Sequence, residues 1–70
     1  MKDFVERMIA EESELTIKIN NLDRFIKSDK FVDLSGTEQQ LLQGQLYYMK
    51  EYCNVLSTRI NYYQNKDGEL

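Results

Sequence analysis

Four side chains in the second half of the sequence have the types and spacing of a nucleotide site: Tyr48, Tyr52, Arg59 and Tyr62. Aromatic rings stack on nucleobases, and a guanidinium binds phosphate through two parallel hydrogen bonds. Steps of four, seven and three residues place all four on one side of an α-helix. Tyrosines at this spacing are also typical of an interface between protomers. Both interpretations stay open: an interface alone, or an interface that also holds a ligand.

A second group of cations lies near the middle of the chain. Arg24, Lys27 and Lys30 precede a predicted helix start at Ser35 to Thr37. The free amides of a helix N-terminus, together with nearby cations, can hold an anion. Three aspartates are interleaved with these cations and weaken their field, so a solvated surface is the alternative interpretation.

Residue types needed for catalysis or metal binding are scarce. The sequence has no histidine and one cysteine, Cys53, which falls within an apolar pattern. Without a histidine, this thiol lacks its usual activating base. Glu11, Glu12 and Glu14 form an acidic cluster, but they point in different directions from a helix and fit a solvated patch. We therefore expect no enzyme activity, no metal and no cofactor.

The charge balance limits the classes of partner. Lysine and arginine total 9 against 12 acidic residues, which gives a net charge of −3. Binding to duplex nucleic acid is not expected from this balance. No apolar run approaches the ~18 residues of a membrane span, and the first residues resemble an amphipathic helix more than a signal peptide. We expect a cytoplasmic protein, in the cytoplasm of a host cell, without a membrane partner.

Two apolar stripes on one helix organise the chain. The first is a seam with steps of four and three residues, which keeps one helix face on a packing partner. It comprises Leu42, Leu46, Met49, Cys53, Leu56, Ile60 and Tyr63. The second stripe lies beside the seam and comprises Leu41, Tyr48, Tyr52, Val55 and Tyr62, with Arg59 in line. Two stripes require two partners, and a chain of 70 residues supplies only one of them.

That one partner is a first helix at about residues 3–28. Its apolar face follows the heptad spacing and comprises Phe4, Val5, Met8, Leu15, Ile19, Leu22, Phe25 and Ile26. Glu11 and Glu12 interrupt this face. We expect both carboxylates to be exposed to water, because buried unpaired charge is costly; pairing with cations of a partner is the alternative.

A connector at about residues 29–36 joins the two helices, and its Phe31, Val32 and Leu34 are expected to tuck over the end of the pair. Ser35 and Glu38 fit a capping box that starts a helix at about residues 37–65. The fold prediction is all-α: one domain over residues 1–70, an antiparallel helical hairpin that assembles into a homo-oligomeric helical bundle. Oligomerisation is expected because so small a chain, without disulfide or metal, buries little apolar surface.

The pattern over residues 4–60 resembles a family of small phage proteins first noted in crAss-like phages. The matching positions are Glu6 to Met8, Glu12 to Leu15, Lys18, Ile19, Leu22, Phe25, Ile26, Phe31, Leu34, Glu38, Gln39, Leu41, Leu42, Gln45, Met49, Tyr52, Leu56, Arg59 and Ile60. The resemblance implies a phage accessory protein and no catalytic role.

Small phage proteins of this size often act against host defence, and helical sponges that sequester cyclic nucleotides or ADP-ribose-type signals are homo-oligomers with pockets between protomers. By analogy of fold, the expected function is sequestration of such a signal. The alternative is a protein–protein adaptor or inhibitor, in which the same tyrosines and Arg59 contact a host protein.

Overall fold

A computed structural model describes residues 3–68, with side chains described for residues 3–65. The chain forms α1 (Asp3–Ile26), the single turn α2 (Asp29–Val32) and α3 (Gly36–Gly68). No strand occurs within these residues, which confirms the all-α prediction. The first helix ends two residues earlier than expected. The backbone amide and the hydroxyl of Ser28 both donate to the Phe25 carbonyl, at 3.0 and 2.6 Å, and this tight turn replaces the regular helical pattern.

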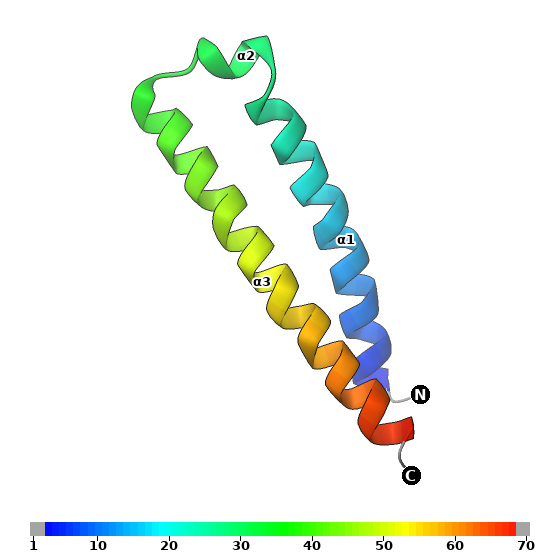
Figure 1. The fold of residues 1–70 in the computed structure, drawn as a ribbon. Helices are drawn as coiled ribbons and strands as arrows, with labels where there is room; N and C mark the ends of the chain where they lie inside the picture. Colours follow the sequence, from blue (N-terminus) through cyan, green and yellow to red (C-terminus); the bar gives the residue numbers. More distant parts are fainter. Residues whose placement is uncertain (1–2, 69–70) are drawn as a thin grey trace.

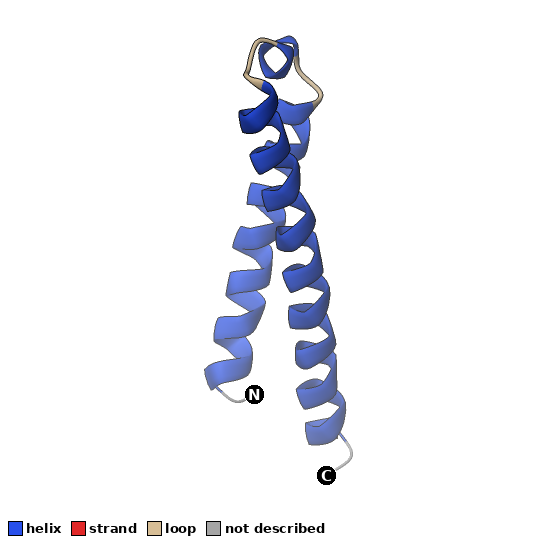
Figure 2. Cartoon of the chain, turned by 90° about the vertical axis from the view of Figure 1, so that its left-hand side faces the viewer, coloured by secondary structure: helices blue, strands red, loops and turns tan. Residues whose placement is uncertain are grey.

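α1 and α3 run antiparallel along one another, and the two ends of the described chain lie together at the end opposite α2 (Figure 1). The molecule is a rod of 54 × 15 × 15 Å. Seen from the side, the two long helices cross at an angle (Figure 2). The radius of gyration is 15.9 Å, compared with roughly 11 Å for a compact chain of this length. The pair therefore exposes much of its length to solvent.

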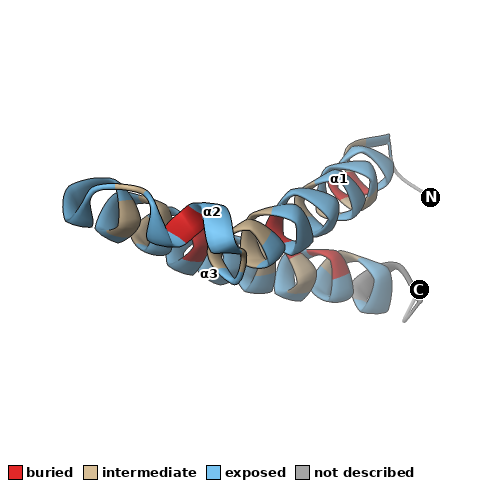
Figure 3. Cartoon of the chain, turned by 90° about the horizontal axis from the view of Figure 1, so that it is seen from above, coloured by how far each residue is buried: buried red, intermediate tan, exposed pale blue. Residues whose placement is uncertain are grey.

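The core lies along the line where α1 meets α3, and buried segments occur on both of these helices and on α2 (Figure 3). Val5 and Met8 of α1 pack with Leu56 and Ile60 of α3. Val5 and Leu56 are fully buried, and burial of each stabilises the fold by about 1.5–3 kcal/mol. Every residue of the predicted seam is buried or half-buried. The spacing thus identified the core-facing side of α3.

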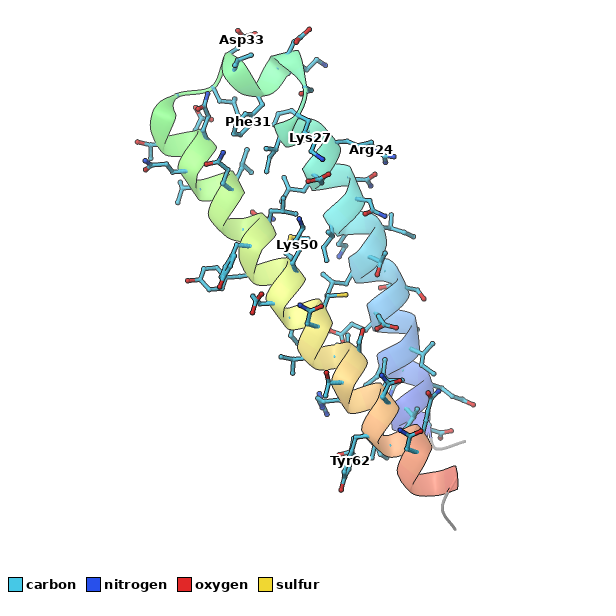
Figure 4. All side chains as sticks on the ribbon, in the orientation of Figure 1. Arg24, Lys27, Phe31, Asp33, Lys50 and Tyr62 are labelled. Carbon is cyan, nitrogen blue, oxygen red and sulfur yellow. The ribbon has the colours of Figure 1, made fainter. Side chains whose placement is uncertain are left out.

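α2 closes the other end of the pair through one of the two large apolar side chains that it carries. Phe31 is buried, points between the long helices (Figure 4) and contacts Phe25 edge-to-face at 6.4 Å between ring centroids. Leu34, just after the turn, is half-buried. Val32 is 70% exposed, so its predicted place over the end of the hairpin is wrong. A helical turn directs adjacent residues about 100° apart, and Phe31 takes the inward position.

The amino-terminal end of α3 has the predicted capping box. The Glu38 amide donates to Ser35 Oγ at 3.1 Å, and the Ser35 amide donates to Glu38 Oε1 at 3.3 Å. These bonds satisfy amides that the first helical turn leaves without partners.

None of the helices within residues 3–68 combines the length and the apolar composition that crossing a membrane requires.

Candidate functional site

The second stripe of α3 remains on the surface after the hairpin has formed. We call it the tyrosine stripe: Leu41, Tyr48, Tyr52, Val55, Arg59 and Tyr62. Tyr48 is 71% exposed and Tyr62 is 58% exposed. Tyr62 points away from α1 (Figure 4). The side chains proposed from sequence to contact a nucleotide are thus exposed to solvent, and the chain does not use them to form its core.

The four candidate ligand residues do not converge within one chain. Tyr48 and Tyr62 are fourteen residues apart on one continuous helix, and a rise of 1.5 Å per residue separates them by about 21 Å. Tyr52 and Arg59 are two turns apart and lie on the same side of α3. One small nucleotide cannot reach all four side chains of a single protomer. Arg59 with Tyr62, three residues further on, is the closest set that pairs a cation with an aromatic ring.

Tyr52 is oriented by α1. Its hydroxyl donates a hydrogen bond of 2.7 Å to Glu11 Oε2. This hydrogen bond raises the pKa of Tyr52 above its usual 10.0, and desolvation and the Glu11 charge act in the same direction. The Arg59 charge acts in the opposite direction, because a cation favours the phenolate. The ring of Tyr52 therefore lies beside a carboxylate, which disfavours an anionic group next to it.

The other tyrosines of the stripe contact neighbouring rings. Tyr48 meets Tyr47 edge-to-face, with ring centroids 5.1 Å apart, and Tyr62 meets Tyr63 at 5.2 Å. Tyr63 in turn contacts Phe4 of α1 at 4.8 Å. A continuous line of rings thus connects the core at this end of the rod with the exposed ring of Tyr62.

The expectation that Glu11 and Glu12 of α1 are both exposed to water is wrong for Glu12. Both Glu11 and Glu12 receive hydroxyl hydrogen bonds from α3: Tyr52 donates to Glu11, and Ser57 donates to Glu12. Glu11 is exposed as predicted, whereas Glu12 is half-buried against Ser57. Cations of a partner are not needed to explain the two glutamates. Hydroxyl donors across the helix pair satisfy these carboxylates without a full desolvation cost.

The residues of the second candidate site are spread over α1, the connector, α2 and α3, and their binding of an anion stays a prediction. Lys27 Nζ lies 2.9 Å from Asp23 Oδ2, and Arg24 points away from α3 (Figure 4). Lys30 on α2 and Thr37 on the first turn of α3 are exposed on separate elements. The amides at the start of α3 already face the capping box, which includes the Glu38 carboxylate.

Asp23 links the cations at this end of the rod. The hydrogen bond from Lys27 lowers the pKa of Asp23 below its usual 3.8; desolvation opposes this shift, while the charges of Lys27 and Lys50 add to it. Lys50 belongs to α3 and points toward α1 (Figure 4), so Asp23 attracts Lys27, just past the end of α1, and the charge of Lys50 on α3. This attraction across the helices was not predicted from sequence.

Gln39 was also missed by sequence analysis. Its side-chain nitrogen donates to the carbonyls of Phe31 and Leu34, at 3.1 and 3.2 Å, and ties α2 to α3. The only sign of this role in the sequence is the position of Gln39, a polar residue in the first turns of a helix, next to a connector whose backbone carbonyls need hydrogen-bond donors.

Among the described residues, no group of three or more histidine, cysteine, aspartate or glutamate side chains is placed to hold a metal ion.

Comparison with known proteins identifies a family and a curated relative. A family model described as Sequestin matches residues 2–62. A protein of Enterobacteria phage T4, described as an uncharacterized 7.5 kDa protein in the denB-rIIB intergenic region, is 40% identical over 60 residues. This alignment covers 86% of the present chain and 94% of the T4 protein. No solved structure matches significantly. The chain is thus similar to a protein of phage T4. Its relationship to the proteins of crAss-like phages stays a prediction.

Proposed function

Because the chain belongs to the Sequestin family, we propose that this helical phage protein sequesters a small anionic nucleotide, a signal of host defence, in pockets formed where protomers meet. The family name supports sequestration, and the T4 relative supports a phage origin. The relative is itself uncharacterized, so the class of ligand rests on the chemistry of the tyrosine stripe.

The observation that carries the proposal is the exposure of Arg59 among tyrosines on a chain of net charge −3. A guanidinium holds phosphate in two-point hydrogen bonds, and an adjacent aromatic ring stacks on a base. An acidic protein attracts anions poorly in general, so a specific anion site must concentrate its cation beside groups that recognise the rest of the ligand. Arg59 with Tyr62 meets this requirement, whereas the Glu11 carboxylate beside Tyr52 repels phosphate.

Sequestration also fits the small size of the protein. We expect no enzyme activity, so the free concentration of a signal falls only by stoichiometric binding. Such binding favours a small chain that can be made in many copies and an assembly with several equivalent sites. We propose that the chain acts as a homo-oligomer in the cytoplasm of the host cell and takes no metal or cofactor.

Calorimetry and thermal shift against a panel of cyclic di- and trinucleotides and ADP-ribose cyclisation products test the proposal. We expect micromolar or tighter binding of at least one compound and its loss in Arg59→Ala. The matched control is Arg24→Ala, which removes an exposed guanidinium that points away from α3. Equal weakening by both variants indicates attraction of an anion by overall charge, and loss in Arg24→Ala alone moves the site to the other end of the rod.

A protein–protein adaptor or inhibitor remains the second candidate, favoured by the large exposed tyrosines of the stripe. Tyrosine and arginine are the residue types that dominate binding energy at protein interfaces. Absence of a shift with every nucleotide, together with specific capture of one host protein that Tyr48→Ala abolishes, supports this candidate over sequestration.

A further inference from the structure

The tyrosine stripe has a spacing that is symmetric about its own centre. The intervals between the large apolar residues of the stripe, counted from Leu41 to Tyr62, are the same within about one residue as those counted back from Tyr62 to Leu41. We propose that two copies of the chain pair through α3, antiparallel about a two-fold axis at Tyr52, and that each nucleotide pocket is shared between them. The pairing stands on the structure alone, whereas the shared pocket rests on the proposed function.

The amount of exposed surface indicates that this face is covered. The chain has an accessible surface of 5397 Å², roughly 800 Å² more than the ~4,600 Å² expected of a compact monomer of this mass. A standard protein interface buries about 800 Å² on each partner. Five large hydrophobic side chains of the stripe are exposed, and the least exposed of them, Tyr52, is still 44% exposed. The excess is therefore sufficient for a stable pair.

The symmetric spacing favours a second copy as the occupant. In the proposed pairing, Leu41 lies opposite Tyr62 of the partner subunit, and Tyr48 lies opposite Val55 of the partner subunit. Tyr52 meets its own copy at the axis. Each large exposed side chain of the stripe thus gains a large partner, as a self-complementary interface requires. A shift by one heptad in one direction leaves Leu41, which is 69% exposed, beyond the end of the contact, and a shift in the other direction leaves Tyr62, which is 58% exposed, beyond it.

Charge selects the antiparallel direction. Arg59 is the only charged member of the stripe. In a parallel two-fold pair Arg59 meets its own copy, and two guanidinium groups repel. In the antiparallel pair Arg59 lies within one residue of the level of Gln45 of the partner subunit, whose side-chain carbonyl can accept a hydrogen bond. Gln45 lies on the same side of α3 as the stripe and is exposed.

The pairing brings together ligand residues that one chain keeps apart. Tyr48 and Arg59 of one protomer are about 16 Å apart along α3, at 1.5 Å per residue. Across the axis, Tyr48 of the partner subunit lies about 5 Å along the helix from Arg59. Packed helices cross at an angle and separate away from the point of closest approach, which leaves space on both sides of the axis. Each pocket then has Arg59 and Tyr62 from one subunit and Tyr48 from the other.

Contacts with α1 explain why the anion sites lie away from the axis. Glu11 accepts a hydrogen bond from the Tyr52 hydroxyl, so each subunit places the Glu11 carboxylate beside the axis. Two such carboxylates disfavour phosphate at the centre of the pair. The phosphate is directed to the Arg59 ends, and one dimer holds two equivalent sites.

Cysteine cross-linking tests the pairing and its register. All variants carry Cys53→Ser, which removes the only native thiol. Helices packed 8–10 Å apart bring Cα atoms at the axis within disulfide range, so Tyr52→Cys should form a disulfide dimer. Asn61→Cys, an exposed position outside the stripe, is the control and should not. Leu41→Cys and Tyr62→Cys lie where the crossing helices have separated, so each should stay uncross-linked alone, and the mixture should be joined by a bismaleimide that spans more than a disulfide.

Two results of this experiment overturn the pairing. Dominant cross-linking at Val55→Cys, with none at Tyr52→Cys, means that the register is wrong. Sedimentation of the wild-type chain as a monomer at micromolar concentration means that no second copy covers the stripe.

Mixing of two inactive variants tests the shared pocket. Tyr48→Ala and Arg59→Ala should each bind no nucleotide. In a mixed dimer, one pocket carries both substitutions and the other carries neither, so refolding the two chains together should restore about a quarter of the wild-type capacity. No restoration, while the wild type binds nucleotide and Tyr52→Cys cross-links, places the pocket within one subunit and overturns the sharing. A wild type that cross-links yet binds no nucleotide overturns the proposed function and leaves the pairing standing.

Discussion

The Tyr52 hydroxyl donates to Glu11 Oε2 at 2.7 Å, across 41 positions of the sequence, and this bond fixes one face of α3 against α1. Tyr52 belongs to a stripe that the helix periodicity assigned to a partner outside the chain. Its ring nevertheless takes its orientation from the chain's own first helix. The same bond places a negative charge next to the stripe, and this charge distinguishes the surroundings of Tyr52 from those of Tyr62.

Replacement Tyr52→Phe should lower the denaturation midpoint at neutral pH, because Glu11 loses its hydroxyl donor. The raised pKa of Tyr52 also fixes the sign of the pH dependence. The folded state holds the proton more tightly than the unfolded state, whose pKa is about 10, so the stabilisation is fully present below pH ~10. It is lost as the pH rises through the folded-state pKa. The denaturation midpoints of the two proteins should therefore differ at neutral pH and converge at alkaline pH.

An ultraviolet titration of tyrosinate checks the same assignment. Compared with wild type, Tyr52→Phe should lose one tyrosine that ionises above pH ~10. Loss of a tyrosine that ionises at or below pH ~10 contradicts the assignment.

Substitutions at the adjacent residues Val55 and Leu56 of α3 should affect assembly and folding differently. Leu56 is fully buried, and Leu56→Ala should cost about 2–5 kcal/mol, comparable with the ~3–5 kcal/mol that a core of this size supplies. Leu56→Asp should unfold the chain. Val55 is 56% exposed, so Val55→Ala should keep the helical circular dichroism signal and weaken self-association in sedimentation. Equal loss of helix in Leu56→Ala and Val55→Ala contradicts the assignment of these residues to two different faces.

The hydrogen bonds that hold the connector against α3 should depend on the side-chain NH2 group of Gln39. In Gln39→Glu a carboxylate replaces the nitrogen that serves the Phe31 and Leu34 carbonyls, and the cost should be about 1–3 kcal/mol in chemical denaturation. Gln40→Glu is the matched control, because it adds the same charge near the same helix end from an exposed position. That change should remain within about 0.5 kcal/mol of wild type. Similar effects of the two substitutions argue against the connector bonds.

The polar break in the apolar face of α1 should be replaceable only together with its hydroxyl donor on α3. Ser57→Ala leaves the half-buried Glu12 carboxylate without its donor and should cost about 1 kcal/mol. The double variant Glu12→Leu with Ser57→Ala continues the apolar face and should be at least as stable as wild type. A double variant less stable than Ser57→Ala alone means that Glu12 stabilises the fold through other contacts. Thermal denaturation of wild type, Ser57→Ala, Glu12→Leu and the double variant measures the coupling.

Local features of the chain were determined by sequence. The seam from Leu42 to Tyr63 faces the core as its spacing predicts, because helical periodicity places those side chains on one side whatever they pack against. The capping box of Ser35 and Glu38 forms because both of its bonds close within three residues. The exposure of Tyr48 and Tyr62 follows from the same periodicity, since a two-helix chain covers one face of α3 and not two.

Only the tertiary structure decided which side chains meet across the helix pair. The bonds from Tyr52 to Glu11 and from Ser57 to Glu12 depend on the axial register and rotation of α1 against α3, and apolar spacing tolerates shifts larger than a hydrogen bond allows. The inward turn of Phe31 and the outward turn of Val32 likewise depend on where the connector meets both helices. Periodicity is a property of one helix, whereas a contact between helices requires the relative position of two.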